Sequence, residues 1–193
     1  MSDAEANTEV WLVRHGETEW SRSGRHTGRT DLEMTPEGEQ AARQLGPVLA
    51  GTSFNRVWCS PRLRARRTAE LARLDRVEVH DELVEWDYGD YEGLTRVEIQ
   101  EARPDWQIWT HGAPGGESPQ EMATRADGVV AACRDAGGRT LLVAHGHFLR
   151  SLAARWIAQP IAVGAHLPLD TARVSVLGFD RGAPTLDRWN STS

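Results

Sequence analysis

The sequence predicts an α/β fold of three layers, α/β/α, with a mostly parallel central sheet. Short apolar runs alternate with segments of helical composition, which is the pattern of a parallel sheet covered by helices on both faces. Two of the runs end in the same dipeptide, His15-Gly16 and His145-Gly146. Because ligands bind beyond the carboxyl ends of parallel strands, these polar residues are delivered to the edge where such folds do chemistry.

The first predicted strand is the apolar run at 9–13, which reads as a buried parallel strand. A loop at 14–35 follows. Thr35 then marks the start of a helix that reaches about residue 49, because a threonine N-cap precedes Pro36 and carboxylates occupy the first turn. The apolar stripe of this helix is expected to face the sheet.

The remaining elements continue the alternation. Further strands are predicted at 57–59, 77–80, 140–144, 172–179 and, as an edge strand, near 184–189, and helices at 62–73, 94–102, 119–135 and 148–158. The stretch 104–119 is dense in Gly, Pro and Trp and is expected to form a lid-like insertion in which Trp106 and Trp109 pack into core or lid. We expect one domain over residues 1–193, with a substrate-selecting insertion near 85–118.

Composition disfavours several functional classes. The net charge of −6 argues against a nucleic-acid partner. The two cysteines, Cys59 and Cys133, are far apart, which fits a reducing compartment rather than a disulfide framework. The acidic N-terminus lacks the features of a signal peptide, and no apolar run is long enough to span a bilayer. We therefore expect a cytoplasmic protein without a membrane partner; the oligomeric state stays open, with a homodimer as one candidate.

A basic cluster stands out in this acidic chain. Four arginines fall within six residues: Arg62, Arg64, Arg66 and Arg67. For most of them a solvated helix face is the expected environment. If the predicted strands are neighbours, one of these arginines converges with Arg14, His15 and His145 on a single pocket. Arginine forks and backbone N–H groups bind phosphate oxygens, so such a pocket suits a dianionic phosphoryl group.

Two other chemistries fit parts of this pattern. The spacing of His145 and His147 suits two zinc ligands, but no further carboxylate or cysteine ligand lies at a suitable spacing. Cys59 ends a strand and precedes arginines, as in a cysteine-based phosphatase. That mechanism needs an arginine six positions after the cysteine, where Ala65 stands. We therefore expect neither a metal nor a cofactor.

Four motifs occur in order along most of the chain: LVRHGETEW (12–20), SPRLRARRTAE (60–70), LVEWDYGDYEGL (83–94) and VAHGHFLR (143–150). Together they resemble the signature of the histidine phosphatase superfamily, the phosphoglycerate-mutase-like clan. The resemblance implies that His15 is a nucleophile that forms a phosphohistidine. It also implies that Arg14, Arg64 and His145 hold the phosphoryl oxygens, with the two arginines lowering the pKa of His15.

The resemblance further implies that Glu85 protonates the leaving oxygen and then activates water. A phosphate dianion nearby raises the pKa of such an acid, so that it can hold the proton. Asp87 and Glu92 are competing acids, and the match to the motif, rather than the chemistry, selects Glu85.

Departures from the mutase pattern favour hydrolysis. Ser21 and His147 stand where cofactor-dependent mutases carry asparagine, and no Arg-Arg pair occurs between Glu92 and Glu117. The motifs are similar to those of sugar bisphosphatases and actinobacterial acid phosphatases. We expect a metal-independent phosphomonoesterase acting on small phosphorylated metabolites, sugar phosphates first among them. The alternatives are a cofactor-dependent phosphoglycerate mutase and a non-catalytic phospholigand-binding domain.

Contacts to the substrate beyond its phosphate are expected from a second group of residues. Those in the predicted binding set are Ser21, Thr27, Gly28, Tyr88, Arg96, Gly146 and His147, with Glu117 and Ser118 as further candidates. Thr27, Gly28 and Tyr88 match ligand-binding positions of the family that the motifs resemble. Most of the others rest on proximity in the sequence alone.

Overall fold

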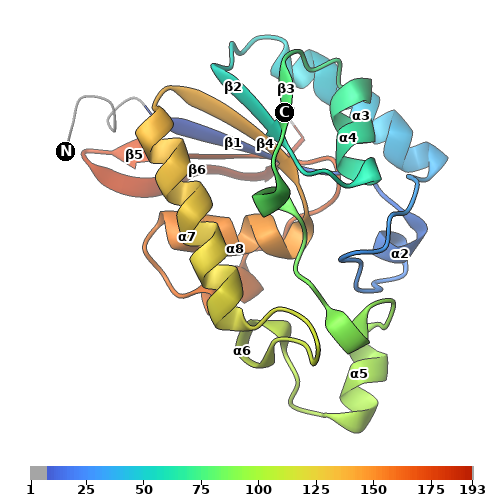
Figure 1. Ribbon diagram of the computed structural model, residues 1–193. Coiled ribbons are helices and arrows are strands. Elements are labelled where there is room, and N and C mark those ends of the chain that lie inside the picture. Colours follow the sequence, from blue (N-terminus) through green and yellow to red (C-terminus); the bar gives the residue numbers. More distant parts are fainter. Residues whose placement is uncertain (1–7, 193) are drawn as a thin grey trace.

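The computed structural model describes residues 8–192 as a six-stranded sheet between two helical layers (Figure 1). The strands are β1 (Glu9–Arg14), β2 (Arg56–Cys59), β3 (Val77–Val79), β4 (Arg139–Ala144), β5 (Val174–Asp180) and β6 (Ala183–Ser191), in the order β3-β2-β4-β1-β5-β6. The first four pair in parallel, while β5 runs antiparallel to both β1 and β6. The predicted mostly parallel, three-layer fold is confirmed. Residues 1–7, which contribute to the expectation of no signal peptide, lie outside the described residues.

The topology brings the carboxyl ends of three parallel strands together. Strand β4 lies between β1 and β2, with Arg14 opposite Ala144 and Cys59 opposite Val143. The residues that follow these strands therefore emerge side by side at one edge. The strands that end before His15 and His145 are neighbours, as the sequence analysis required.

Helices cover both faces of the sheet (Figure 1). They are α2 (Glu19–Arg22), α3 (Pro36–Leu49), α4 (Leu63–Leu71), α5 (Arg96–Ala102), α6 (Ile108–His111), α7 (Pro119–Ala136) and α8 (Gly146–Trp156), with 3-10 helices η1 (Asp81–Leu83), η2 (Gly89–Tyr91) and η3 (Ile161–His166). Helices α3 and α4 pack with Val13 in one core, and α7 and α8 pack with Leu12 in the other, because side chains of a strand alternate between faces. Among residues 8–192, no helix is long and apolar enough to cross a membrane.

Helix termini follow the local sequence closely. The side chain of Thr35 accepts a hydrogen bond from the backbone N–H of Gly38 at 3.0 Å, which confirms it as the N-cap of α3. Helix α2 lies inside the predicted loop, where Thr18 and Ser21 form a capping box. Helix α8 begins at Gly146, two residues earlier than predicted, because His145 takes the extended N-cap conformation.

Burial in helix α4 and strand β3 does not follow residue polarity. Leu63 is 43% exposed, whereas Arg64 beside it is fully buried. Helix α4 thus turns its small residues, Ala65 and Ala69, to the core together with one guanidinium. All three residues of strand β3 are exposed, because β3 is an edge of the sheet.

The stretch 104–119 is tied to the larger core by its aromatic residues. Trp106 and Trp109 are 2% and 7% exposed, and both belong to that core. The indole N–H of Trp106 donates to the carbonyl oxygen of Gly112 at 2.8 Å, and the ring of Trp109 meets Trp86 edge-on at 5.8 Å between centroids. The expected core packing of both tryptophans is confirmed. The short helix α6, which the sequence analysis did not predict, carries Trp109.

Candidate active site

A cavity of ≈ 140 Å³ opens beyond the carboxyl end of strand β1 and the N-terminus of α8. The predicted site residues that line it are Arg14, His15, Ser21, Thr27, Glu85, Tyr88, Gly146 and His147. A larger groove of ≈ 1200 Å³ lies at the opposite end of β2, between α3 and α4, and no histidine lines it. Three of the five predicted catalytic residues therefore line the smaller cavity. Arg64 and His145 do not line it and are buried behind it, close to His15.

His15 is held as a neutral imidazole with one nitrogen available. Its Nδ1 lies 2.7 Å from the carbonyl oxygen of Gly16, which can only accept, so Nδ1 carries the proton and Nε2 has the free lone pair. Burial, reinforced by the Arg64 and Arg14 guanidinium groups, holds the pKa of His15 well below its usual value. A buried, neutral imidazole of this tautomer can act as a nucleophile at neutral pH.

Two arginines lie close to this histidine: Arg64 is fully buried and Arg14 is half-buried. The Arg64 guanidinium donates to the carbonyl oxygens of Thr27 and Thr30, each at 2.9 Å, and its nearest carboxylate, Asp31, is 3.9 Å away. Arg14 donates to the carbonyl oxygen of Leu169. The Nε atoms of both arginines are buried without a partner among residues 8–192. Guanidinium groups with buried, unpartnered N–H donors form a site for an anion.

The loop that holds Arg64 is itself fixed by Glu92. The backbone N–H groups of Gly28 and Thr30 donate to the Glu92 carboxylate at 2.9–3.0 Å. A side chain at Gly28 would lie 2.6 Å from the carbonyl oxygen of Trp86, so only glycine allows the loop to approach this closely. Glu92 is thus engaged in holding the backbone and does not line the cavity.

Asp87, the other competing acid, is also engaged. Its carboxylate pairs with Arg29 at 2.6 Å and accepts the backbone N–H of Gly89 at 3.1 Å. It lines a neighbouring cavity of ≈ 370 Å³ rather than the one that contains His15. Of the three acids weighed from the sequence, Glu85 alone lines the His15 cavity.

The Glu85 carboxylate sits at the N-terminus of α8. It accepts the backbone N–H groups of Trp86 and Phe148 at 2.8 Å through Oε1 and that of His147 at 3.0 Å through Oε2. His145, the N-cap residue, makes no capping hydrogen bond with its own side chain, so Glu85 supplies the cap from another segment. A single carboxyl group therefore touches both the cavity and the helix that follows His145.

His145 is fully buried and its ring centroid lies 5.1 Å from that of His15. Its Nε2 is 2.7 Å from the hydroxyl oxygen of Ser60, whereas its Nδ1 is buried with no partner within the described chain. Burial, together with nearby Arg64, holds the pKa of His145 well below its usual value. The ring is therefore neutral, and one nitrogen is left to contact a bound group.

The far side of the cavity carries residues suited to recognising the rest of a substrate. His147 Nδ1 and the Tyr88 hydroxyl oxygen are 2.6 Å apart. Burial lowers the pKa of His147 and raises that of Tyr88, so both are neutral. His26, which stacks with His147 at 6.0 Å, and Arg150 also line the cavity.

His26 and Arg150 were missed from the sequence. Arg150 packs over the Trp109 ring at 4.7 Å, donates to the carbonyl oxygen of Gly164 at 2.9 Å and has no carboxylate partner within residues 8–192. It lies one helical turn beyond Gly146, and this spacing places both on one face of α8. That spacing was the signal that could have found Arg150.

Other expected contacts lie outside this cavity. Gly28 and Glu117 line the neighbouring cavity, Ser118 is the N-cap of α7, and Arg96 is exposed at the start of α5. Within the described residues, no cluster of three or more His, Cys, Asp or Glu side chains is arranged to hold a metal ion.

The cysteine alternative also meets a physical obstacle. Cys59 is buried, and burial raises the pKa of its thiol to about 12. At neutral pH it is a thiol rather than the thiolate that a nucleophilic cysteine requires.

Comparisons with known proteins agree with this geometry. Residues 10–192 match the model of the histidine phosphatase superfamily (branch 1). The chain is 44% identical over 184 residues to an acid phosphatase of Mycobacterium tuberculosis, covering 93% of this chain and 91% of the relative. It is 39% identical over 179 residues to a sedoheptulose 1,7-bisphosphatase of Saccharomyces cerevisiae, covering 75% of this chain and 66% of the relative.

The solved structure of the open reading frame Rv3214 from Mycobacterium tuberculosis superimposes with a TM-score of 0.92 at 43% sequence identity. The superposition covers 95% of this chain and 97% of the solved chain. The phosphoglycerate-mutase-like form of the fold, expected from the motifs, is thereby confirmed. The match to the family model spans nearly the whole chain and includes all four motifs. The chain belongs to the histidine phosphatase superfamily (branch 1) and is a phosphatase.

Proposed function

We propose that this phosphatase is a metal-independent phosphomonoesterase that hydrolyses small phosphorylated metabolites through a phosphohistidine at His15. The observation that carries the proposal is a neutral His15, with a free lone pair on Nε2, beside Arg14 and Arg64, whose buried Nε atoms have no partner within residues 8–192. Sugar phosphates are the substrate class we favour, because one relative is named a sedoheptulose 1,7-bisphosphatase.

In the first step, Nε2 of His15 attacks the phosphorus atom and an N–P bond forms as the P–O bond to the leaving group breaks. The electron pair of that bond goes to the leaving oxygen, which takes a proton from the Glu85 carboxyl group. Arg14 and Arg64 donate to the non-bridging oxygens and stabilise the charge that they carry. His145 does the same through Nδ1 when the Ser60 hydroxyl donates to its Nε2.

In the second step, water attacks the phosphorus atom of the phosphohistidine and gives a proton to the Glu85 carboxylate. The N–P bond breaks and its electron pair returns to Nε2 of His15, which restores the enzyme. The net reaction converts a phosphate monoester and water into an alcohol and inorganic phosphate. Oε2 of Glu85 accepts a single N–H in the structure, so it has capacity left to carry this proton.

Substrate selection is assigned to the rest of the cavity. Its volume of ≈ 140 Å³ suits a small molecule. We propose that the neutral pair of Tyr88 and His147 contacts hydroxyl groups, together with Ser21 and Thr27, while Arg150 meets a second anionic group. In this proposal the chain is one catalytic domain over residues 1–193, whose segment near 85–118 contributes to selection through Tyr88. Gly146 leaves room for Arg14, because a side chain there would lie 3.2 Å from its Nε.

The mechanism is tested by incubating the enzyme with a labelled phosphodonor and then quenching the reaction with acid or with base. A phosphohistidine is labile to acid and stable to base, and it should be absent from His15→Ala. The matched control is His166→Ala, because His166 is exposed on η3, away from the cavity. Lack of an acid-labile phosphoprotein, or full activity of His15→Ala, would contradict the mechanism. Incubation with a phosphoglycerate separates release of free phosphate from isomerisation by a mutase.

We place the protein in the cytoplasm, which is supported by two buried, unpaired cysteines, Cys59 and Cys133. Cell fractionation tests this placement. We also propose a homodimer, supported by the exposed edge strand β3 with its exposed Val77 and Val79. Light scattering that returns the mass of a single chain at micromolar concentration would contradict the dimer.

A further inference from the structure

The segment that carries Glu85 belongs to no helix or strand. It runs between η1 and η2 and pairs with none of the six strands. A proton donor must nevertheless be held within a fraction of an ångström of its productive position. The groups that fix this segment therefore bear directly on the chemistry assigned to Glu85.

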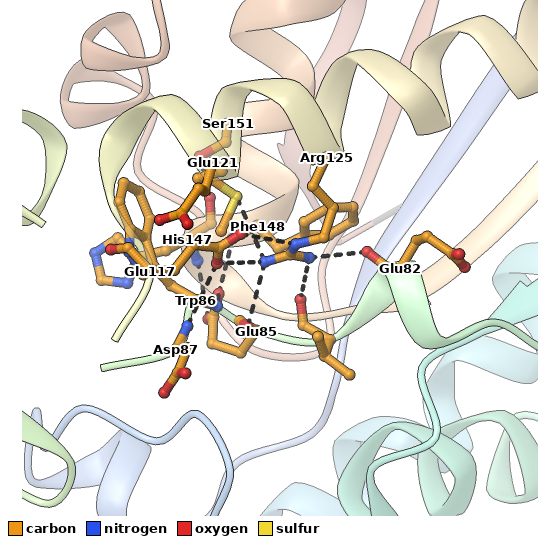
Figure 2. Close-up of polar contacts among 12 residues, drawn as sticks. Glu82, Glu85, Trp86, Asp87, Glu117, Glu121, Arg125, His147, Phe148 and Ser151 are labelled. Carbon is orange, nitrogen blue, oxygen red and sulfur yellow. Dashed lines mark hydrogen bonds and ion pairs between the residues drawn. The ribbon is translucent and has the colours of Figure 1, made fainter. Parts of the chain in front are cut away.

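Arg125 of α7 binds the backbone of this segment and of η1, which precedes it (Figure 2). Its Nη1 donates to the carbonyl oxygens of Glu82 and Val84, each at 2.8 Å, and its Nη2 reaches that of Glu85 at 3.4 Å. The guanidinium carbon lies 4.8 Å above the centre of the Phe148 ring. Because the backbone N–H of Phe148 binds Oε1 of Glu85, Arg125 contacts both segments that hold the carboxyl group.

Glu117 holds Arg125 in turn. Its two carboxylate oxygens accept hydrogen bonds from Nε and Nη2 of Arg125 at 2.9 and 2.7 Å. The side chains of Arg125 and Glu117 are only 17% and 12% exposed, so water screens this bidentate ion pair weakly. The backbone of Glu117 also pairs with the segment, because its carbonyl oxygen accepts the Trp86 indole N–H at 2.8 Å and its N–H donates to the carbonyl oxygen of Asp87 at 2.9 Å.

We propose that Arg125 and Glu117 are positioning residues for Glu85 as the proton donor. Neither lines the His15 cavity. The planar guanidinium group of Arg125 fixes the distance and orientation between the backbone carbonyls of the segment and Phe148 on α8. The Glu85 carboxyl group is thereby held between the N-terminus of α8 and the cavity. The inference rests on the proposed function, in which Glu85 protonates the leaving oxygen.

The test compares two leaving groups. The 4-nitrophenolate ion leaves readily without a proton, whereas the alkoxide from glycerol 3-phosphate requires one. Arg125→Lys keeps the charge but cannot form the planar set of contacts. General acid catalysis contributes roughly 10²–10⁴-fold, so we expect kcat/KM to fall about tenfold or more for glycerol 3-phosphate and less than about threefold for 4-nitrophenyl phosphate. Glu117→Gln should shift the same ratio in the same direction, by less.

Two controls separate positioning from loss of structure. Arg134 is a second arginine of α7, which donates to the carbonyl oxygen of Trp156 and lies 4.8 Å from its ring, so Arg134→Lys makes a comparable change away from the cavity. It should leave the ratio of the two kcat/KM values unchanged. Adding Arg125→Lys to Glu85→Gln should not change the ratio further, because the proton donor is already absent.

The outcomes distinguish the two claims. If Glu85→Gln changes the ratio but Arg125→Lys lowers both values equally, the positioning role is refuted and the proposed function stands. If Glu85→Gln itself leaves the ratio unchanged, the acid role in the proposed function fails. A ratio that shifts in both Arg125→Lys and Glu117→Gln, with thermal unfolding showing folded enzyme, supports the positioning role.

Discussion

Glu92 holds the loop whose carbonyl oxygens hold Arg64, and Glu92→Gln should therefore weaken both folding and catalysis. The Glu92 carboxylate accepts N–H groups from Gly28 and Thr30. A glutamine with its amide oxygen in place of Oε1 still accepts both N–H groups, but its NH₂ group then takes the place of Oε2, 3.0 Å from the Gly28 nitrogen, where it faces another donor and has no acceptor. An unsatisfied donor costs about 1–3 kcal/mol, which sets the expected loss in the free energy of unfolding.

The effect on catalysis follows from the position of Arg64. Removing one donor from an oxyanion site costs roughly 10²–10³ in kcat, and here the donor is displaced rather than removed. We therefore expect kcat/KM to fall about tenfold, which corresponds to ~1.4 kcal/mol of transition-state stabilisation. The loss should be equal for alkyl and aryl phosphates, since both present the same phosphoryl group.

Urea unfolding and steady-state kinetics on both substrates measure these effects, with Glu101→Gln as a control at an exposed glutamate of α5. A Glu92→Gln variant with unchanged stability and unchanged kcat/KM would refute the link from Glu92 through the loop to Arg64. A loss confined to alkyl phosphates would instead make Glu92 the proton donor.

Three further predictions test other parts of the site. Arg150→Met should raise KM about tenfold for a sugar bisphosphate and much less for a monophosphate, as measured from initial rates. Equal increases in KM for both substrates would contradict a contact between Arg150 and a second anionic group. The pKa values of His15 and His145 are lowered in the folded protein, so the unfolded chain binds more protons below about pH 6.5. The free energy of unfolding should therefore fall as the pH drops below that value, and it should fall less in His145→Gln. Urea titrations at pH 5 and 7.5 will measure this difference. The thiol of Cys59, with its pKa raised to about 12, should resist iodoacetamide at pH 8, and rapid inactivation in wild type but not Cys59→Ser would contradict this.

The sequence alone predicted the fold class and the edge of the sheet at which the candidate site residues meet. Strand and helix periodicity is a local property, so the strands that end before His15 and His145 could be found without coordinates. Their convergence followed from the rule that parallel strands present their carboxyl ends at one edge. The four motifs then identified the family to which the chain belongs.

Local patterns failed where packing decides the environment. Leu63 is apolar and its neighbour Arg64 is charged, yet the structure exposes the first and buries the second. The carbonyl oxygens of the loop at 27–30 lie where the Arg64 guanidinium can bind them, and their position depends on Glu92, more than sixty residues further along the chain. No window of sequence contains both partners.

The match to a motif selects Glu85 among the three acids, but only the tertiary structure shows how their environments differ. Asp87 and Glu92 lie within seven residues of Glu85 and have the same chemistry, so spacing could not rank them. Packing engages Asp87 with Arg29 and Glu92 with a backbone loop, and leaves Glu85 at the cavity. The contacts of Arg125 likewise join α7 to a segment some forty residues earlier. A sequence specifies which groups a chain carries, but hydrogen bonds depend on distance and direction, and these exist only once the helices have packed against the sheet.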